Sequence, residues 1–313
     1  MRSLAATALV LGSAVAAAIA PVWTYAITLA LFGLPHVLVE LRYVDERFAA
    51  RIPRNLIFGL GVGLAGIVVM RAFGLLGVGS SNERITLELV LGVSLIAVAF
   101  PLLRRVKTSP LAIAVGSGLL IGIYYAPAAT LVTMALLHNL TPVGFLAERL
   151  QGSKRRRAML LCAIVFGAIP AALLILPAST MLLTGPLSVG HIDDHIGTFV
   201  PPALLGTSFA DRLFAAAAFL QCMHYAVVMH VLPRLSGGSE ATAAVVSWPK
   251  QRLFTAAVVT AGLLMTIGFV ANFRSARSVY SMFAAVHAWI EIPVLLIACA
   301  VLPRSASNQP TTA

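Results

Sequence analysis

Long apolar runs, separated by short breaks that hold charged residues, prolines and glycines, make up most of this chain. A helix that crosses a membrane needs about 20 mostly apolar residues, and this criterion predicts about ten spans. The candidate spans cover residues 3–20, 23–43, 56–77, 85–103, 111–126, 128–148, 158–184, 211–232, 252–273 and 279–302. The pattern therefore predicts an all-α fold, a polytopic transmembrane helix bundle.

Two boundaries between spans leave alternatives open. Residues 1–20 begin with a basic residue and are otherwise apolar and small, which fits a cleaved signal peptide or a first span. We favour the span, because Pro21 leads directly into another apolar run. Residues 111–148 contain the break at Tyr125–Pro127 and form either one kinked helix or two helices, since proline is tolerated in a membrane helix whose neighbours satisfy the freed carbonyl.

Composition and charge agree with a membrane location. Hydrophobic residues make up 59% of the chain and charged residues only 11%, whereas soluble domains carry about 25% charged residues. The net charge of +11 comes from short basic clusters between apolar runs, without the basic face and interleaved aromatics that nucleic acid would need. We expect the lipid bilayer to be the partner and predict no nucleic-acid binding.

The basic residues also predict an orientation. With the N-terminus inside, 17 of the 22 Lys and Arg residues fall in inside segments, 4 fall outside, and Arg71 lies within a span. The positive-inside rule expects this bias, so we predict N-in/C-in topology in the cell (inner) membrane, with an even number of spans. Residues 1–303 are predicted to form a single transmembrane domain, and 304–313 a disordered cytoplasmic tail.

Ionisable residues inside spans are costly and usually functional, and here they recur in one pattern. His36 is followed four residues later by Glu40, and His287 is followed four residues later by Glu291. Positions i and i+4 share one face of a helix, so each histidine and its glutamate are expected to point the same way. Two other spans carry His138-Asn139 and the group Gln221, His224, Tyr225 and His230.

In the predicted topology these four spans run parallel, and the histidines lie at comparable depths. We therefore predict that His36, His138, His224 and His287 converge on one point within the bilayer and bind a transition metal. Neutral imidazole suits iron, copper or zinc. Glu40 and Glu291, the candidate catalytic carboxylates, are either acceptors that fix the imidazole tautomer or direct ligands in a two-metal site. An apolar site around a redox metal suits a lipid-soluble substrate and dioxygen.

Three other interpretations of these residues stay open. A membrane histidine is often only a hydrogen-bond donor between helices. Two axial histidines on facing helices would hold a b-type haem, in an electron carrier or an assembly factor. A proton-coupled or ion-coupled transporter would use the histidines and glutamates as a relay.

Some ionisable residues lie outside this pattern. Glu88 stands alone in its span and is either a helix–helix contact or a channel residue, and Arg71 either snorkels or pairs with it. The outside loop at about 185–210 holds the string His191-Ile192-Asp193-Asp194-His195. We favour an exposed polar loop there over a second metal-binding string.

The string Gly33-Leu34-Pro35-His36-x3-Glu40 resembles the opening signature of the Brp/Blh family, the membrane β-carotene 15,15′-dioxygenases. The segment His224-Tyr225-x4-His230-x2-Pro233-Arg234 resembles the late histidine-rich segment of that family. Val37 stands where the family has glycine, and Glu40 where it usually has aspartate. The resemblance implies a non-haem iron held by His36, His138, His224 and His287. It also implies oxidative cleavage of a carotenoid or related isoprenoid by dioxygen.

Overall fold

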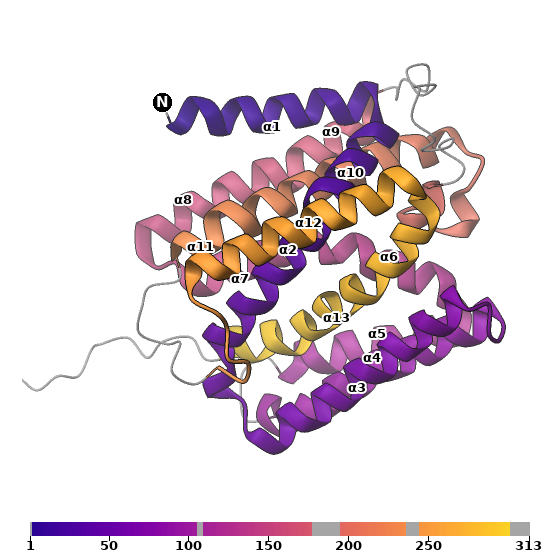
Figure 1. Ribbon diagram of the computed structural model, residues 1–313, viewed down its shortest axis with the longest axis vertical. Coiled ribbons are helices and arrows are strands. Elements are labelled where there is room, and N and C mark those ends of the chain that lie inside the picture. Colours follow the sequence, from indigo (N-terminus) through magenta and orange to yellow (C-terminus); the bar gives the residue numbers. More distant parts are fainter. Residues whose placement is uncertain (1, 105–108, 177–194, 236–243, 301–313) are drawn as a thin grey trace, which may run out of the picture.

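The computed structural model describes residues 2–104, 109–176, 195–235 and 244–300, and these segments are helical, with no strand among them (Figure 1). The predicted all-α fold is confirmed. The helices in chain order are α1 (Arg2–Ile19), α2 (Pro21–Phe48), α3 (Arg54–Leu75), α4 (Ser81–Leu103), α5 (Ser109–Tyr125), α6 (Pro127–His138), α7 (Thr141–Arg149), α8 (Gly152–Ala163), α9 (Ile169–Ile175), α10 (Ser208–Ala226), α11 (Leu232–Leu235), α12 (Gln251–Ala271) and α13 (Phe273–Ala300). The short helical turns between them are η1 (Ala49–Arg51), η2 (Ile164–Ala168), η4 (Ile196–Thr198), η5 (Pro202–Leu204) and η6 (Val227–Val231).

Seven helical segments of the described chain are long and apolar enough to cross a membrane, or eight if the bent pair α6 and α7 is one span. The seven are Pro21–Arg51, Arg54–Leu75, Ser81–Leu103, Gly152–Ile175, Ser208–Leu235, Gln251–Ala271 and Phe273–Ala298. The apolar helices α1 and α5 are shorter than the length that this criterion requires. The molecule therefore has the architecture of a multi-pass membrane protein, while ten spans and their orientation stay predictions.

Proline ends the helices at both boundaries that the sequence left open. Ala20 and Ala126 precede prolines and leave the helical region, with φ/ψ of −146°/60° and −156°/66°. Steric clash with the proline ring disfavours helical geometry in the preceding residue, whereas proline fits the first turn of the next helix. Residues 111–148 are thus divided between α5 and the pair α6 and α7, which bends by 41°.

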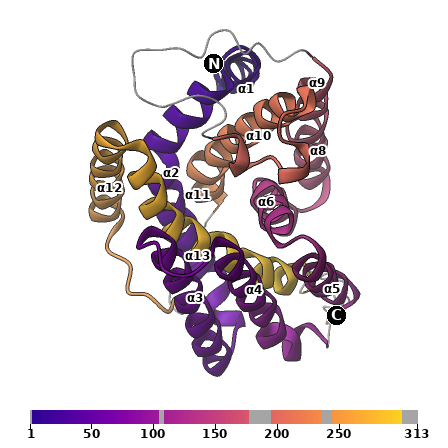
Figure 2. The ribbon, with the colours of Figure 1, turned by 90° about the vertical axis from the view of Figure 1, so that its right-hand side faces the viewer.

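Helices α2, α10 and α13 lie in the middle of the bundle and carry most of the polar residues found there. α2 contacts α1, α10, α12 and α13, and α13 contacts α3, α4 and α7 as well (Figure 2). α1 packs on α10 and α9 at the edge of the bundle. The central helices are well covered, because 61% of the most apolar window of α2 is buried, compared with 17% for α3.

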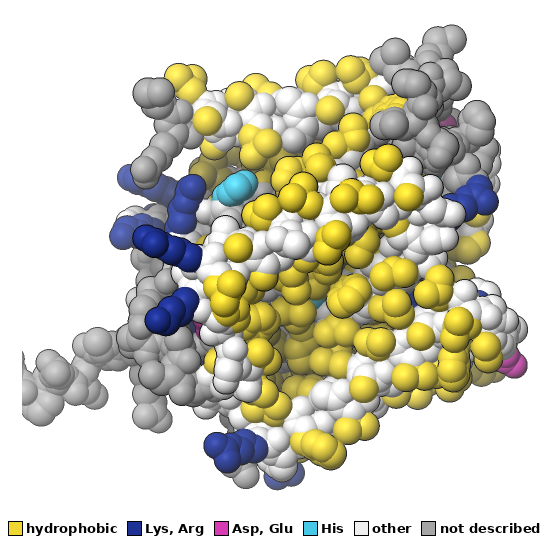
Figure 3. Space-filling model, in the orientation of Figure 1, with side chains coloured by type: hydrophobic (Ala, Val, Ile, Leu, Met, Phe, Trp, Pro, Cys, Tyr) yellow, Lys and Arg dark blue, Asp and Glu magenta, His cyan; other side chains and the backbone are white. Residues whose placement is uncertain are grey.

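On the side shown in Figure 3, the surface of the bundle is largely apolar, and Lys and Arg side chains gather along its left edge, from the side of α8 and α11 in Figure 1 down to the start of α3. Arg47 at the end of α2 and Arg51 of η1 pair with Glu148 of α7 at 2.8 and 3.2 Å. On the side shown in Figure 3, a hollow lined with hydrophobic side chains lies between α12 and α3.

Candidate metal centre

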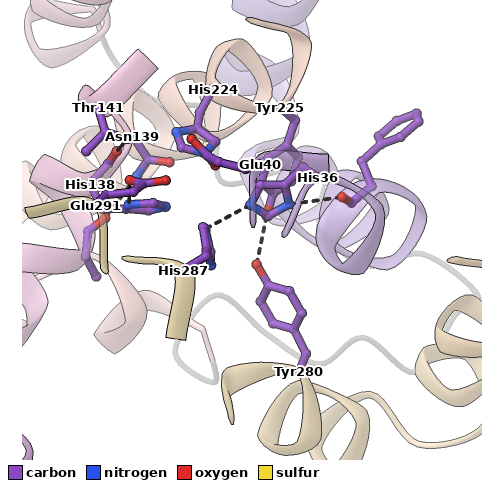
Figure 4. A network of polar contacts seen from close by, with 12 residues as sticks. His36, Glu40, His138, Asn139, Thr141, His224, Tyr225, Tyr280, His287 and Glu291 are labelled. Atoms are coloured by element: carbon purple, nitrogen blue, oxygen red, sulfur yellow. Dashed lines mark hydrogen bonds and ion pairs between the residues drawn. The ribbon is translucent and has the colours of Figure 1, made fainter. Parts of the chain in front are cut away.

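Four helices bring their histidines to one point, as the sequence predicted. His36 of α2, His138 at the end of α6, His224 of α10 and His287 of α13 offer ring nitrogens that all lie within 4.8 Å of one another (Figure 4). Glu40, His287 and Glu291 form a second group whose ligand atoms also lie within 4.8 Å. We call these six residues the histidine cluster.

The histidine cluster is almost completely shielded from solvent and lipid. His36 and His224 are 1% exposed, His287 is 2% exposed, and both glutamates are 0% exposed. His138 is the most accessible member, with 14% of its side chain exposed. Because polar groups are expensive to bury away from water, a cluster of six needs partners for all its donors and acceptors.

His36 is held in a tautomer that suits metal binding. Its Nδ1 lies 3.0 Å from the backbone carbonyl oxygen of Phe32, one turn earlier in α2. Since that oxygen only accepts, Nδ1 carries the proton and Nε2 presents a lone pair toward the centre. Nε2 of His36 lies 3.2 Å from Nε2 of His287. Two ring nitrogens this close need a proton or a cation between them.

Each glutamate contacts a histidine of another helix, although each also points into the cluster with the histidine of its own helix, as the i, i+4 spacing predicted. Oε2 of Glu40 lies 3.2 Å from Nε2 of His224, and Oε2 of Glu291 lies 3.0 Å from Nδ1 of His138. Residues one turn apart on a helix are separated by about 5.4 Å along its axis. A shared face therefore aims both side chains inward without joining them, and the neighbouring helix supplies the nearer partner.

Several polar atoms of the histidine cluster have no hydrogen-bond partner. They are Oε1 of Glu40, both carboxylate oxygens of Glu291, and Nδ1 of His138, His224 and His287. The 3.0 Å pair of His138 and Glu291 meets the distance of an ion pair but lacks the alignment of a hydrogen bond. Buried polar atoms are normally satisfied, so these atoms are available to bind a ligand.

The charges in the cluster also favour a cation. Two carboxylates whose oxygens lie within 4.8 Å repel each other by about 3.5 kcal/mol at an effective dielectric constant of about 20. In the described part of the chain, Glu40 and Glu291 form ion pairs only with histidines. A bound divalent ion would neutralise both carboxylates and would accept the lone pairs of the imidazoles.

The dimensions fit one metal ion after small side-chain movements. Metal–imidazole bonds are about 2.0–2.1 Å long, so two nitrogens on opposite sides of an ion are about 4.2 Å apart. A ligand spread of 4.8 Å must therefore contract by a few tenths of an ångström. The same packing leaves no room for a haem held between His36 and His287, because a macrocycle would have to fit between their Nε2 atoms, which are 3.2 Å apart.

Two tyrosines stand beside the centre and were not identified as site residues from the sequence. The ring of Tyr225 lies 4.0 Å from that of His36, centroid to centroid, and its hydroxyl group is 3.4 Å from that of Tyr280 (Figure 4). Tyr225 directly follows His224, a signal that could have been used. Tyr280 lies seven residues, about two turns, before His287 on α13, and no local pattern distinguishes it.

A second polar group lies between α3, α4 and α13. Nη2 of Arg71 donates to Oε1 of Glu88 at 2.7 Å, and Nε1 of Trp289 donates to the same oxygen at 3.1 Å. Of the two alternatives left open for Arg71, the structure shows the pair with Glu88, and Glu88 is a contact between helices. We call Arg71, Glu88 and Trp289 the ion-pair cluster.

Two other histidines are not members of the centre. His230 is exposed in η6, beyond His224. His195 is 1% exposed and packs against the rings of Tyr25 and Phe273, while its Nδ1 lies 3.1 Å from Nη1 of Arg277. The expectation of an exposed loop is therefore wrong for His195, whose ring fills a gap between aromatic side chains. His191, Asp193 and Asp194 lie outside the described residues.

The fold and the site together define a class: an apolar helical bundle of the multi-pass membrane type, with a buried histidine–carboxylate cluster able to bind a metal ion. Comparison of the chain with protein-family models, with curated proteins and with solved structures gives no match in any of the three.

Proposed function

We propose that this protein is an integral membrane oxygenase that uses a histidine-ligated non-haem iron and acts on a carotenoid, another isoprenoid or a similar lipid-soluble substrate. One observation carries the proposal: four imidazoles and two carboxylates meet in a dry interior and leave buried nitrogen and oxygen atoms unpaired. His36, His138, His224 and His287 would hold the ion. Iron is preferred among the metals that imidazole suits because of the resemblance to the Brp/Blh family.

The charge of the cluster favours one ion over two. Four neutral imidazoles and two carboxylates balance one divalent cation, so the filled site carries no net charge. A second divalent cation would leave two positive charges uncompensated in a medium where isolated charges are strongly disfavoured. We therefore expect Glu40 and Glu291 to act mainly as positioning and charge-balancing partners of His224 and His138.

The reaction implied by the resemblance fits an apolar, water-excluding site. One carbon–carbon double bond is broken and each of its carbons takes one oxygen atom of dioxygen, so two carbonyl groups form without a further reductant. Bound iron would supply the activation of dioxygen. The chain's own residues exclude water and orient the substrate. The hydrophobic hollow between α12 and α3 supports access for the substrate from the bilayer.

The membrane arrangement that we propose has ten spans, with both termini on the cytoplasmic side of the cell membrane. α1, α5 and the bent pair α6 and α7 would add three spans to the seven long ones. The basic edge in Figure 3 would then be the inner face.

Metal analysis tests the proposal most directly. Protein purified in detergent should contain about one iron per chain, and His138→Ala should lose most of it because one imidazole ligand is missing. His230→Ala is the matched control, since this histidine is exposed and outside the cluster, and it should retain wild-type iron. Wild-type protein that binds neither iron nor copper nor zinc after metal reconstitution would overturn the proposal.

The substrate class needs a separate measurement. Wild-type protein supplied with a carotenoid in micelles should consume one dioxygen for each double bond cleaved and release two carbonyl products. His36→Ala should consume none. Iron-loaded protein without any oxygen uptake across carotenoids and shorter isoprenoids would remove the oxygenase function and leave only the metal site.

A proton-coupled transporter is the second candidate, and one observation favours it. His138 is the last residue of α6, where the chain bends by 41° before α7, and broken helices at mid-membrane are typical of transporters. A pH change inside proteoliposomes that depends on Glu291, in protein free of metal, would favour this function over the oxygenase.

A further inference from the structure

Trp289 lies between two members of the histidine cluster but faces away from them. It is two residues after His287 and two before Glu291 on α13. Successive helical residues are about 100° apart, so a side chain two positions away points to nearly the opposite side. One side of α13 therefore presents His287 and Glu291 to the centre, and the other side presents Trp289 to α4.

The indole of Trp289 is fixed both by shape and by a hydrogen bond. It is 4% exposed and packs directly on Gly92 of α4, where an added Cβ would be 2.1 Å from Cζ3 of the indole. Its Nε1 donates to Oε1 of Glu88 at 3.1 Å. Glu88 is 3% exposed and pairs with Arg71 on α3: Nη2 of Arg71 donates to Oε1 at 2.7 Å, and Nε lies 2.6 Å from Oε2 without the alignment of a hydrogen bond.

Apart from Trp289, α13 makes polar side-chain contacts near its start, where Arg277 lies 3.1 Å from His195 and Tyr280 lies 3.4 Å from Tyr225; around Trp289 its other neighbours are mainly apolar. Apolar contacts between membrane helices resemble those with lipid, so hydrophobicity alone does not select one rotation of a helix. A shift of α13 by one residue would turn it by about 100° and remove both His287 and Glu291 from the centre. A polar anchor with directional bonds supplies the specificity that apolar packing lacks.

We propose that Arg71, Glu88 and Trp289 are positioning residues that fix the rotation of α13 and so place His287 and Glu291 at the metal. The inference rests on the proposed metal site. It assigns a role to a charged group that lies outside the centre. It also explains why α4 has glycine at position 92, where any larger side chain would displace the indole.

The test uses Co²⁺ as a spectroscopic probe, because its visible absorption reports the geometry of its ligands. Trp289→Phe keeps an aromatic ring over Gly92 but loses the N–H donor. It should fold as the wild type does, bind Co²⁺ roughly tenfold more weakly and show a changed absorption spectrum. Trp248→Phe is the matched control, since Nε1 of Trp248 also donates to a carboxylate, that of Asp45, at 2.8 Å and away from the centre. It should leave the Co²⁺ spectrum unchanged.

A second variant separates positioning from folding. Arg71→Met combined with Glu88→Leu removes both charges and the acceptor of the indole, without leaving an unpaired charge. It should remain folded but show the altered Co²⁺ spectrum of Trp289→Phe. Wild-type spectra in both Trp289→Phe and this double variant would overturn the inference. If the wild-type protein itself bound no Co²⁺, the proposed function would fail instead, so the two failures are distinguishable.

Discussion

Two polar groups lie inside this apolar bundle, and they differ in how their carboxylates are neutralised. In the ion-pair cluster the chain supplies its own cation, because Arg71 is bound to Glu88 at 2.6 and 2.7 Å. In the histidine cluster, the ion-pair partners of Glu40 and Glu291 among the described residues are the imidazoles of His224 and His138. The charge of Glu88 is therefore balanced within the chain, whereas the two glutamates of the histidine cluster have only histidines as ion-pair partners among the described residues, an arrangement able to bind a cation.

The largest expected effect is a loss of folding stability when the cation of the ion-pair cluster is removed. Arg71→Met should lower the free energy of unfolding in mixed micelles by about 3 kcal/mol, because it leaves the buried carboxylate of Glu88 without a cation. This value is at the lower end of the range for buried pairs, since 30% of the Arg71 side chain is exposed.

The double variant Arg71→Met and Glu88→Leu provides the control for that measurement. Removing both charges should restore most of the lost stability, because no buried charge remains unpaired. If the double variant were as unstable as the single one, the loss would come from packing by the Arg71 side chain. The claim that Arg71 stabilises the protein by neutralising Glu88 would then be contradicted.

In the histidine cluster, loss of a carboxylate should weaken metal binding without destabilising the metal-free protein. Glu40→Gln should lower the affinity for iron by roughly 10–100-fold, the usual loss when a partner of a ligating histidine is removed. The metal-free variant should be at least as stable as the metal-free wild type, because the repulsion between Glu40 and Glu291 is gone. Chelator competition and unfolding in the presence of a chelator measure the two quantities.

Glu46→Gln is the matched control for Glu40→Gln. Glu46 lies six residues later on α2 and pairs with Arg42 at 2.6 Å, outside the cluster. Its substitution should not change iron binding. A Glu40→Gln protein with wild-type iron affinity and a less stable metal-free form would mean that Glu40 is a structural contact like Glu88.

The smallest expected effect is the loss of stability when one uncharged hydrogen bond between helices is removed. Nε2 of Gln221 donates to Oγ1 of Thr28 at 2.9 Å, and no charge is involved. Thr28→Val should lower the free energy of unfolding by about 0.6 kcal/mol, the average for such bonds in membranes, without affecting iron binding. Thr130→Val, which removes a bond only to the carbonyl of Ala126 within its own helical turn, should change stability less. A loss above about 2 kcal/mol for Thr28→Val would mean that neutral bonds rival the ion pair.

The members of the histidine cluster could be predicted from the sequence because helices that cross a membrane are constrained to be roughly parallel. Parallel spans of similar length bring residues at equal depth to one level, so His36, His138, His224 and His287 could be grouped by their distance from the span ends. The pairing inside the cluster could not be predicted, because it depends on how the helices cross. The spacing of residues along α2 does not determine whether the carboxylate of Glu40 contacts the imidazole of His36 or that of His224.

The ion-pair cluster was predictable only in part. Arg71 and Glu88 stand out as charges in neighbouring spans, and their pairing follows from the cost of leaving either alone. The contribution of Trp289 was not visible, because 201 residues separate it from Glu88 and an indole in an apolar run carries no special signal. The close approach at Gly92 likewise appears only when α4 and α13 are packed together.

By itself the sequence determined that this chain folds as apolar helices and which of its polar groups lie in the apolar interior, because hydrophobic length and the cost of buried charge are properties of each segment alone. Tertiary structure decided which of those groups are neutralised by the chain and which face one another unpaired. That outcome depends on the rotation and crossing of helices distant in sequence, which apolar patterning leaves free and directional contacts fix.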